Sequence, residues 1–268
     1  MQRIIVIEYN ESLLQSLKNR QIVVKTDTLE QIEHKYSESQ RNNNVMAMCV
    51  LLPFTSISQI DFKQEWSQIP MVVYAHNIGD YEKFFSKVDL IRSLNIRFFL
   101  SSESETAFTD LKIMASLGVD CGIYMKEGTK MSDESFLDLA SYYYMSPVAH
   151  ATIEPFAFIQ RHLTEEKNEN FESIYFKNPM MFISATSIEE IEDFDACEDS
   201  DFDIKLRNYY KHFIELDTCS KCPAFKICDK KMMSRLDDCQ SSMAEIYEYA
   251  ELRNEMNKQK EPKTICQL

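Results

Sequence analysis

Short apolar runs alternate with amphipathic stretches along the first 185 residues of the chain. The apolar runs are rich in Val, Ile, Phe and Met, which is typical of strands that are covered on both faces. They predict strands at residues 3–7, 21–25, 45–52, 71–75, 96–101, 119–124, 148–153 and 180–184. The stretches between them predict helices at residues 11–19, 28–41, 80–94, 107–117 and 132–144. The pattern predicts an α/β fold with a mostly parallel sheet, and roughly six to eight βα units favour a partial or full (β/α) barrel over an open sheet.

Two helix ends are marked by particular residues. Gly118 follows Leu117 and precedes an apolar run, as expected of a glycine in the left-handed conformation after the last turn of a helix. Ser132 is followed by Asp133 and Glu134, which predicts a helix that begins with a hydroxyl cap and acidic residues in its first turn.

The composition changes after residue 188. Residues 189–203 carry nine acidic and no basic residues, which indicates a solvated linker or, alternatively, a docking strip for a basic partner. We therefore expect a (β/α) partial-barrel domain at residues 1–188, an acidic linker at 189–205 and a Cys-rich module at 206–268. A final helix is predicted from Met243 to about residue 257.

Charge and glycine content exclude several functions. The chain has 43 acidic and 29 basic residues, a formal charge of −14, which argues against nucleic-acid binding. There are four glycines and no glycine-rich phosphate-binding loop. No apolar run of about 18 residues is present, so no membrane span is expected. The apolar stretch after Arg3 is too short for a secretion signal, and we expect a cytoplasmic protein without a membrane partner.

Four cysteines near the C-terminus form the pattern C-x2-C-x5-C-x10-C. Two thiolates three residues apart bind one metal from a single turn, and two more close a tetrahedral set. The predicted metal or cluster ligands are Cys219, Cys222, Cys228 and Cys239. In a reducing cytoplasm such a set favours metal over disulfides or unpaired thiols. The apolar residues inside the run favour a [4Fe–4S] cluster, with zinc as the alternative.

The remaining cysteines carry weaker signals. Cys49 and Cys121 lie in apolar strands and are expected to be core residues. Cys197, in the acidic segment, and Cys266, in the tail, are minor candidates for an additional ligand.

In a barrel, binding residues gather at the carboxyl ends of the strands. This criterion selects six residues: Glu8, Asp27, His76, Ser101, Lys126 and Glu154. Strand alternation along the sequence VAHATIEPF, residues 148–156, would place His150, Thr152 and Glu154 on one face. We therefore regard His76, His150 and Glu154 as candidate substrate-binding residues. The simpler alternative is that local hydrogen bonds satisfy these side chains and that they have no chemical role.

The cysteine run with a later cysteine is similar to the SPASM auxiliary-cluster region of radical SAM peptide maturases. The upstream sequences LKIMASLGVDCGIYMK, DESFLDLASYYY and VAHATIEPFAFI look like the partial (β/α)6 barrel of those proteins. The resemblance covers most of the chain, but only the cysteine motif is specific. The C-x3-C-x2-C motif that holds the radical-generating cluster is absent, since the first 48 residues contain no cysteine.

The resemblance therefore implies a degenerate radical SAM protein that does not cleave S-adenosylmethionine. Its expected function is that of a noncatalytic partner in ribosomal peptide (RiPP) maturation, which binds a precursor peptide or a companion radical SAM maturase. Two alternatives stay open: a metal-stapled adaptor unrelated to peptides, and an enzyme that uses a His/Glu pocket at the barrel mouth.

Overall fold

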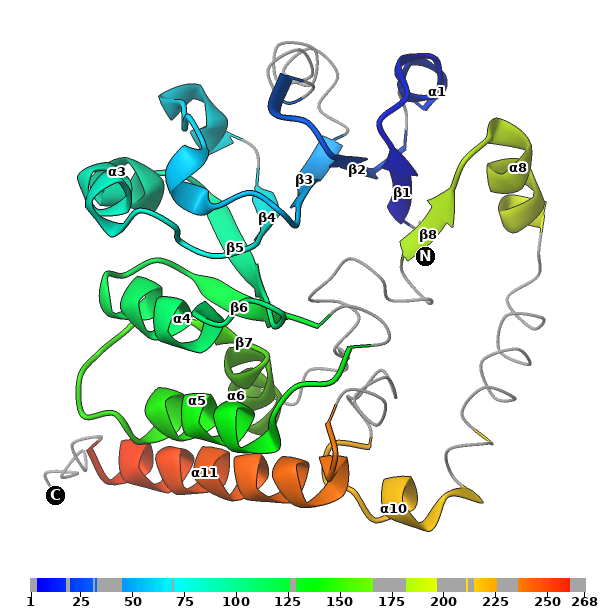
Figure 1. Ribbon diagram of the computed structural model, residues 1–268. Coiled ribbons are helices and arrows are strands. Elements are labelled where there is room, and N and C mark those ends of the chain that lie inside the picture. Colours follow the sequence, from blue (N-terminus) through cyan, green and yellow to red (C-terminus); the bar gives the residue numbers. More distant parts are fainter. Residues whose placement is uncertain are drawn as a thin grey trace, which may run out of the picture.

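The computed structural model describes residues 4–17, 20–30, 32, 45–68, 70–125, 129–165, 182–196, 211, 215–225 and 236–260. In these ranges, eight strands form one parallel sheet with the order β7-β6-β5-β4-β3-β2-β1-β8 (Figure 1). The strands are β1 (Ile4–Glu8), β2 (Ile22–Thr26), β3 (Val45–Leu52), β4 (Met71–Ala75), β5 (Ile96–Ser101), β6 (Cys121–Tyr124), β7 (Ile153–Glu154) and β8 (Phe182–Ala185).

The strand order is that of a partial (β/α) barrel. Strands β1 to β7 follow one another in sequence order, and β8 returns to pair with β1 in parallel register. In a closed barrel β8 would also meet β7, whereas here these two strands are the edges of the sheet in the described part of the chain. The α/β class and the parallel sheet predicted from the apolar pattern are confirmed.

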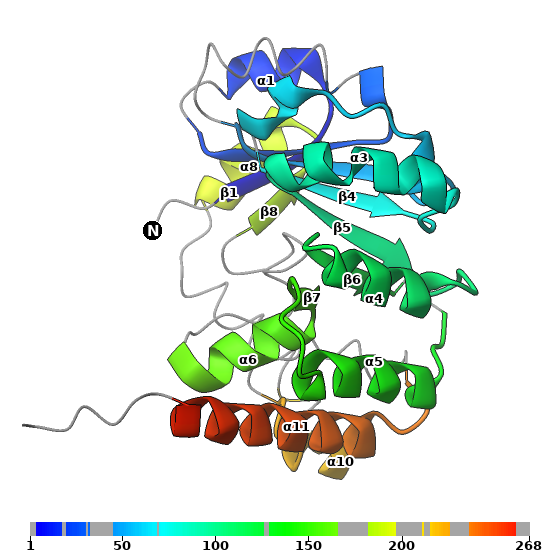
Figure 2. The same cartoon turned by 90° about the vertical axis from the view of Figure 1, so that its left-hand side faces the viewer.

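Helices cover the convex face of the sheet (Figures 1 and 2). The longer ones are α1 (Glu11–Ser16), α3 (Tyr81–Ser93), α4 (Ala107–Ser116), α5 (Asp133–Met145), α6 (Phe156–Glu165) and α8 (Ile188–Ala196). Short 3-10 turns occur at η1 (Ile57–Gln59) and η2 (Gln64–Gln68), and the C-terminal region adds α10 (Asp217–Ser220) and α11 (Cys239–Lys260).

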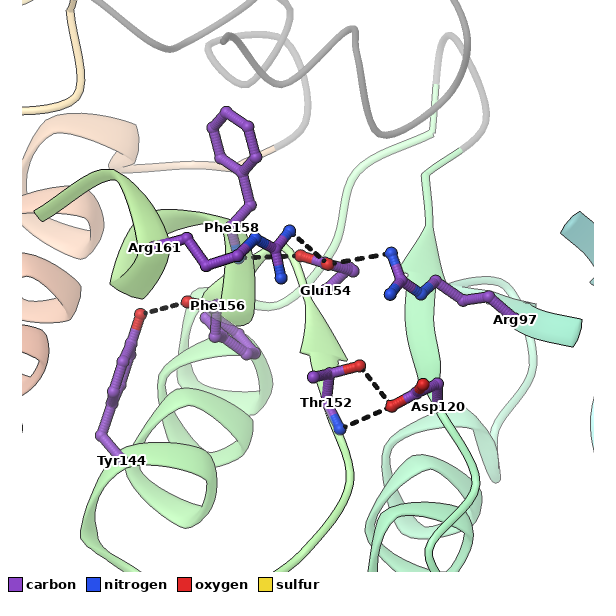
Figure 3. A network of polar contacts seen from close by, with 8 residues as sticks. All are labelled: Arg97, Asp120, Tyr144, Thr152, Glu154, Phe156, Phe158 and Arg161. Carbon is purple, nitrogen blue, oxygen red and sulfur yellow. Dashed lines mark hydrogen bonds and ion pairs between the residues drawn. The ribbon is translucent and has the colours of Figure 1, made fainter. Parts of the chain in front are cut away.

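Alternate residues of each strand face the helices. Ile5 and Ile7 of β1 form one buried cluster with Leu13 of α1 and Ile191 of α8. At the other end of the sheet, Phe98 of β5 packs edge-on against Phe62 at a centroid distance of 5.8 Å. The other side of the sheet is concave, and Glu154 and Arg97 lie on that side (Figures 1 and 3).

Both predicted helix ends are confirmed. Gly118 has φ of +78° and follows the last turn of α4, with its N–H bonded to the carbonyl of Ala115 at 3.0 Å. The Ser132 side chain accepts a hydrogen bond from the N–H of Ser135 at 3.3 Å at the start of α5.

The strand predicted at residues 148–153 is wrong over most of its length. Only Ile153 and Glu154 form β7. The residues before β7 are held by single contacts: the Ala151 N–H bonds to the Ala115 carbonyl at 2.9 Å, and the Thr152 N–H bonds to the Asp120 carboxylate at 3.0 Å. His150, Thr152 and Glu154 therefore do not share one strand.

The acidic segment after residue 188 is helical in its first part. Helix α8 extends over Ile188–Ala196, and thus covers about half of the stretch expected to be a linker. Its start is capped reciprocally, because the Glu190 N–H bonds to the Ser187 hydroxyl and the Glu190 carboxylate accepts the Thr186 N–H at 2.7 Å. Residues 197–205 lie outside the described ranges.

The C-terminal helix α11 packs along α5 and α6 in both views (Figures 1 and 2). Asp133, in the first turn of α5, accepts the backbone N–H groups of Asp237 and Asp238 at 2.9 and 2.7 Å. Near the other end, the guanidinium of Arg253 donates to the Ser146 carbonyl at 3.4 Å. The final helix predicted from Met243 is confirmed and begins one turn earlier.

Among the described residues, no helix has the length and apolar character needed to cross a membrane.

Candidate functional site

The first candidate site is the cysteine run. Cys219 lies in α10 and Cys222 in the turn that follows, where its N–H donates to the Cys219 carbonyl at 3.1 Å. The next turn repeats this contact, since the Phe225 N–H donates to the Cys222 carbonyl at 3.0 Å. The C-x2-C pair is thus carried by one compact turn, the local geometry that brings two thiolates to one metal.

Cys239 is the first residue of α11. Cys219 is buried, whereas Cys222 and Cys239 are half-buried and pack against the main hydrophobic core. Ala224 and Leu236, which lie between cysteines of the run, are almost fully buried in the same core. The three described cysteines therefore belong to a segment that packs onto the barrel domain.

The complete ligand set stays a prediction. Cys228 lies outside the described residues, as do Cys197 and Cys266. Within the described ranges, no group of three or more His, Cys, Asp or Glu side chains is arranged to hold a metal ion. Cys49 and Cys121 are buried in strands, as expected of core residues.

The second candidate site surrounds Glu154 on the concave face of the sheet (Figure 3). Glu154 is 0% exposed. Its Oε1 accepts from Arg97 Nη1 at 3.1 Å and from Arg161 Nη2 at 2.8 Å, and its Oε2 accepts from the Phe158 N–H at 2.9 Å. Strand β5, strand β7 and helix α6 thus meet at one buried carboxylate, and we call Arg97, Glu154 and Arg161 the arginine–glutamate network.

Gly122 makes room for this network. It lies between Phe99 and Glu154 in the register of β5, β6 and β7. A Cβ atom at Gly122 would lie 2.6 Å from a ring carbon of Phe99 and 2.9 Å from the Cβ of Glu154. Only glycine lets these two side chains pack on the same face at this point. Tyr74 continues the row and stacks on Phe99 at a centroid distance of 5.5 Å.

Tyrosines of α5 line the neighbourhood of Glu154. Burial, and then the charge of Glu154, raise the pKa of Tyr143 to about 12. Burial also raises the pKa of Tyr144 well above its ordinary value, and its hydroxyl donates to the Phe156 carbonyl at 2.8 Å. Both phenols therefore stay protonated well above neutral pH and keep a proton to donate.

His76 lies just after β4, at the carboxyl end of the sheet, as predicted, and its N–H donates to the Thr55 carbonyl at 2.9 Å. His150 lies at the other end, before β7. Its two ring nitrogens face the carbonyls of Ala151 and Tyr143 at 3.0 and 2.9 Å, and its ring stacks on Tyr142. The structure therefore places Glu154 on the concave face but does not bring His150 together with His76.

His150 instead lines an open pocket of about 710 Å³ at the amino ends of β5, β6 and β7. Its walls come from the last turns of α3 and α4 and from the segment before β7, and include Phe85, Arg92 and Gly118. In (β/α) barrels this end of the sheet is typically structural.

Sequence reasoning missed one buried acid near the carboxyl ends. Asp110 of α4 is 0% exposed. It accepts the Ile78 N–H at 2.8 Å, the Tyr81 hydroxyl at 2.6 Å and the Thr106 hydroxyl at 3.0 Å. The hydrogen bond to Asp110, together with burial, raises the pKa of Tyr81 to about 12. Asp110 thus fixes the loop between β4 and α3, in which His76 lies, but no local sequence pattern marks it.

The other residues expected at the barrel mouth show no common site. Glu8 pairs with Lys25 at 3.6 Å on the concave face, Ser101 is buried at the end of β5, and Lys126 lies outside the described residues.

No protein-family model matches the chain, and no curated protein or solved structure shows significant similarity to it.

Proposed function

We propose that this chain is a noncatalytic partner in ribosomal peptide maturation, which binds a precursor peptide or a companion maturase and carries a four-cysteine iron–sulfur or zinc centre at its C-terminal end. The observation that carries the proposal is the compact C-x2-C turn of Cys219 and Cys222, packed beside the core of a partial (β/α) barrel. Cys239, the first residue of α11, would be the third thiolate of the proposed set.

The residues fit such a centre in their chemistry. Thiolates bind both iron–sulfur clusters and zinc, and half-buried ligands in an apolar surround shield a cluster from water. When bound, the metal would link the turn after α10 to the start of α11. Because Asp133 already fixes the residues just before α11 to α5, such a link would hold the whole C-terminal segment on the barrel.

Two features support a noncatalytic role. The cysteines that hold the radical-generating cluster in radical SAM enzymes have no counterpart in the first 48 residues. The alternative, an enzyme with a pocket formed by His76, His150 and Glu154, is disfavoured because His150 is bound to backbone carbonyls at the amino ends of the strands. Incubation with S-adenosylmethionine and a reductant should therefore yield no 5′-deoxyadenosine above a blank.

The metal centre is tested by anaerobic purification followed by analysis of iron, sulfide and zinc. We expect about one cluster or one zinc ion per chain, and a loss of at least half of it in Cys222→Ser. Cys49→Ala is the matched control, because it removes a buried thiol of β3 and should leave the metal content unchanged. A wild-type chain without metal, or a Cys222→Ser variant that keeps all of it, would refute the centre.

The peptide role is tested separately. The purified full chain is mixed with any precursor peptide and any radical SAM maturase encoded near its own gene, and complex formation is measured by size-exclusion chromatography and by pull-down. Binding to either supports the proposal. A metal-loaded chain that binds neither would leave a metal-stapled adaptor as the better description.

A further inference from the structure

The open pocket at the amino ends of β5, β6 and β7 has a volume of about 710 Å³, within the range of about 300–1,000 Å³ that small-molecule sites occupy. One wall is a single face of α3, formed by Phe85, Val88, Asp89 and Arg92 at helical spacing. The other walls are the last turn of α4 and the segment before β7, which includes His150. The pocket thus combines an apolar surface with a guanidinium group.

The apolar part of the pocket can cover a ligand. Phe85 is 51% exposed, and it is one of the large apolar side chains that the described part of the chain leaves in contact with water. Val88 is buried and Leu117 is half-buried beside it in the pocket lining. Removing the ring of Phe85 from water would favour the binding of an apolar or aromatic group.

Arg92 supplies the charge that would orient a ligand. Its guanidinium lies against Gly118, since a Cβ atom at that glycine would come within 3.2 Å of Arg92 Nε. The cation is thus placed at the C-terminal end of α4, where the helix dipole favours positive charge. Among the described residues, the guanidinium pairs with Asp89 at 4.0 Å and donates no hydrogen bond. Its donors match the two oxygens of a carboxylate.

Asp89 leaves Arg92 accessible to a ligand. The distance of 4.0 Å is too long for a hydrogen bond, and the Asp89 side chain is fully exposed. Surface pairs of this kind are weak, because water and salt screen both charges. The side chain of Arg92 is itself 55% exposed, so a carboxylate can reach it from solvent.

His150 forms the opposite wall without offering a ring nitrogen to a ligand. Its two nitrogens face the backbone carbonyls of Ala151 and Tyr143, at 3.0 and 2.9 Å. The ring also stacks on Tyr142 at a centroid distance of 5.4 Å. These contacts fix the wall in position, and they assign the polar contact with a ligand to Arg92.

From this geometry we propose that the pocket between α3 and His150 binds a carboxylate joined to an apolar or aromatic group, with the carboxylate on Arg92 and the apolar group against Phe85 and Val88. A free acid and the C-terminal carboxylate of a peptide share this chemistry. The site goes beyond the proposed function, because it uses neither the cysteines nor the carboxyl ends of the strands.

The test titrates the purified full chain with two acids and follows each ligand by saturation-transfer NMR. In one arm 3-phenylpropionate represents a free acid, and in the other an acetylated tripeptide that ends in phenylalanine represents a peptide C-terminus. The corresponding amides serve as uncharged analogues. We expect saturable binding of at least one acid, and the acid that binds more tightly identifies the source. Its amide should bind about tenfold more weakly.

Variants of α3 locate the binding. Arg92→Gln should weaken binding of the acid about tenfold and leave binding of the amide unchanged, whereas Phe85→Ser should weaken both about fivefold. Lys83→Gln is the matched control and should bind like the wild type, since Lys83 is a 70% exposed cation in the first turn of α3 that does not line the pocket. The comparison of acid and amide needs no substitution, so it tests the role of charge even where a variant does not fold. Absence of saturable binding of either acid, equal binding of acid and amide, or undiminished binding of the acid by Arg92→Gln would overturn the site.

Discussion

Replacing Glu154 by glutamine tests the energetic role of the arginine–glutamate network. The substitution keeps the size and shape of the side chain but removes its charge. One end of the resulting amide is a donor, and it must face either the Phe158 N–H or the two guanidinium groups, which are donors as well. At least one of the three hydrogen bonds of Glu154 is therefore replaced by a contact between two donors.

The expected loss of stability is about 3 kcal/mol. Removing one partner of a buried ion pair costs about 3–5 kcal/mol. The lower end applies because both guanidinium groups are one-third exposed and regain some hydration. For a chain of this size, that corresponds to a fall in Tm of about 6–12 °C.

The assay is urea unfolding followed by far-UV circular dichroism and by fluorescence of Trp66, the single tryptophan of the chain, which is buried beside Phe62. The midpoint should fall while the slope m stays unchanged. Glu8→Gln is the control on the same face of the sheet. Its carboxylate is 66% exposed and pairs with Lys25 at 3.6 Å, so its loss should cost less than about 0.5 kcal/mol. A Glu154→Gln variant as stable as the Glu8→Gln control would refute this account of the network.

Three further predictions concern other contacts. Gly122→Ala should lower the free energy of unfolding by about 2 kcal/mol, because the new methyl group overlaps Phe99, and urea unfolding measures this. Asp133→Asn should release the start of α11 and make the C-terminal segment more sensitive to limited proteolysis, since it weakens two backbone hydrogen bonds. Tyr81, whose pKa is raised to about 12 in the folded chain, should titrate nearer its ordinary value in Asp110→Asn, as followed by tyrosinate absorbance against a Tyr81→Phe reference. The Tyr81 hydroxyl keeps its proton in the folded chain up to about pH 12, whereas in the unfolded chain it loses the proton near its ordinary pKa of about 10. The contact therefore contributes its full stabilisation below about pH 10, and this contribution is lost as the pH rises through about 12.

A specific result would contradict each of these three predictions. Adding Phe99→Leu to Gly122→Ala should recover part of the lost stability, and strict additivity of the two substitutions would show that they do not clash. Cleavage of the Asp133→Asn variant at wild-type rates would show that the two backbone contacts do not hold α11. If the pKa of Tyr81 in the Asp110→Asn variant stayed at its wild-type value, burial alone would account for the raised pKa.

Most of the sheet could be predicted from the sequence because each strand is a short, nearly continuous apolar run. The predicted bounds of β3, β4 and β5 agree with the structure residue for residue. In these central strands both faces are covered, so apolar character marks the whole strand. The end of α4 at Gly118 and the start of α5 at Ser132 could also be predicted, because a left-handed glycine and a hydroxyl cap depend on local geometry.

The region around β7 was misread because its signals compete. The sequence from Val148 to Phe156 alternates in a way that resembles a strand, yet α6 begins at Phe156. Pro155 was the usable signal, since it has no N–H to donate and is well tolerated at a helix start. Its carbonyl accepts the Ile159 N–H at 3.1 Å, as in the first turn of a helix.

The acidic segment was misread because its charge outweighed a cap signal. The charge suggested a solvated linker, but Ser187 and Glu190 form the two halves of a helix cap, a pattern that the sequence contains.

The arginine–glutamate network, in contrast, could not be predicted from the sequence. Arg97 and Arg161 are 64 positions apart by number, and only the sheet register, with Gly122 between Phe99 and Glu154, brings their charges to one carboxylate.

The return of β8 to the side of β1 has a consequence for biosynthesis. Strand β1 ends at Glu8, but the partner that covers its second edge starts only at Phe182. At a translation rate of about 5–20 residues per second, some 10–35 s pass before that partner leaves the ribosome. During this interval the backbone N–H and C=O groups on that edge of β1 are open to pairing with other nascent chains, a known route to aggregation. A chain built in this order depends on slow, long-range closure, and we expect its yield on expression to be sensitive to temperature and to chaperone supply.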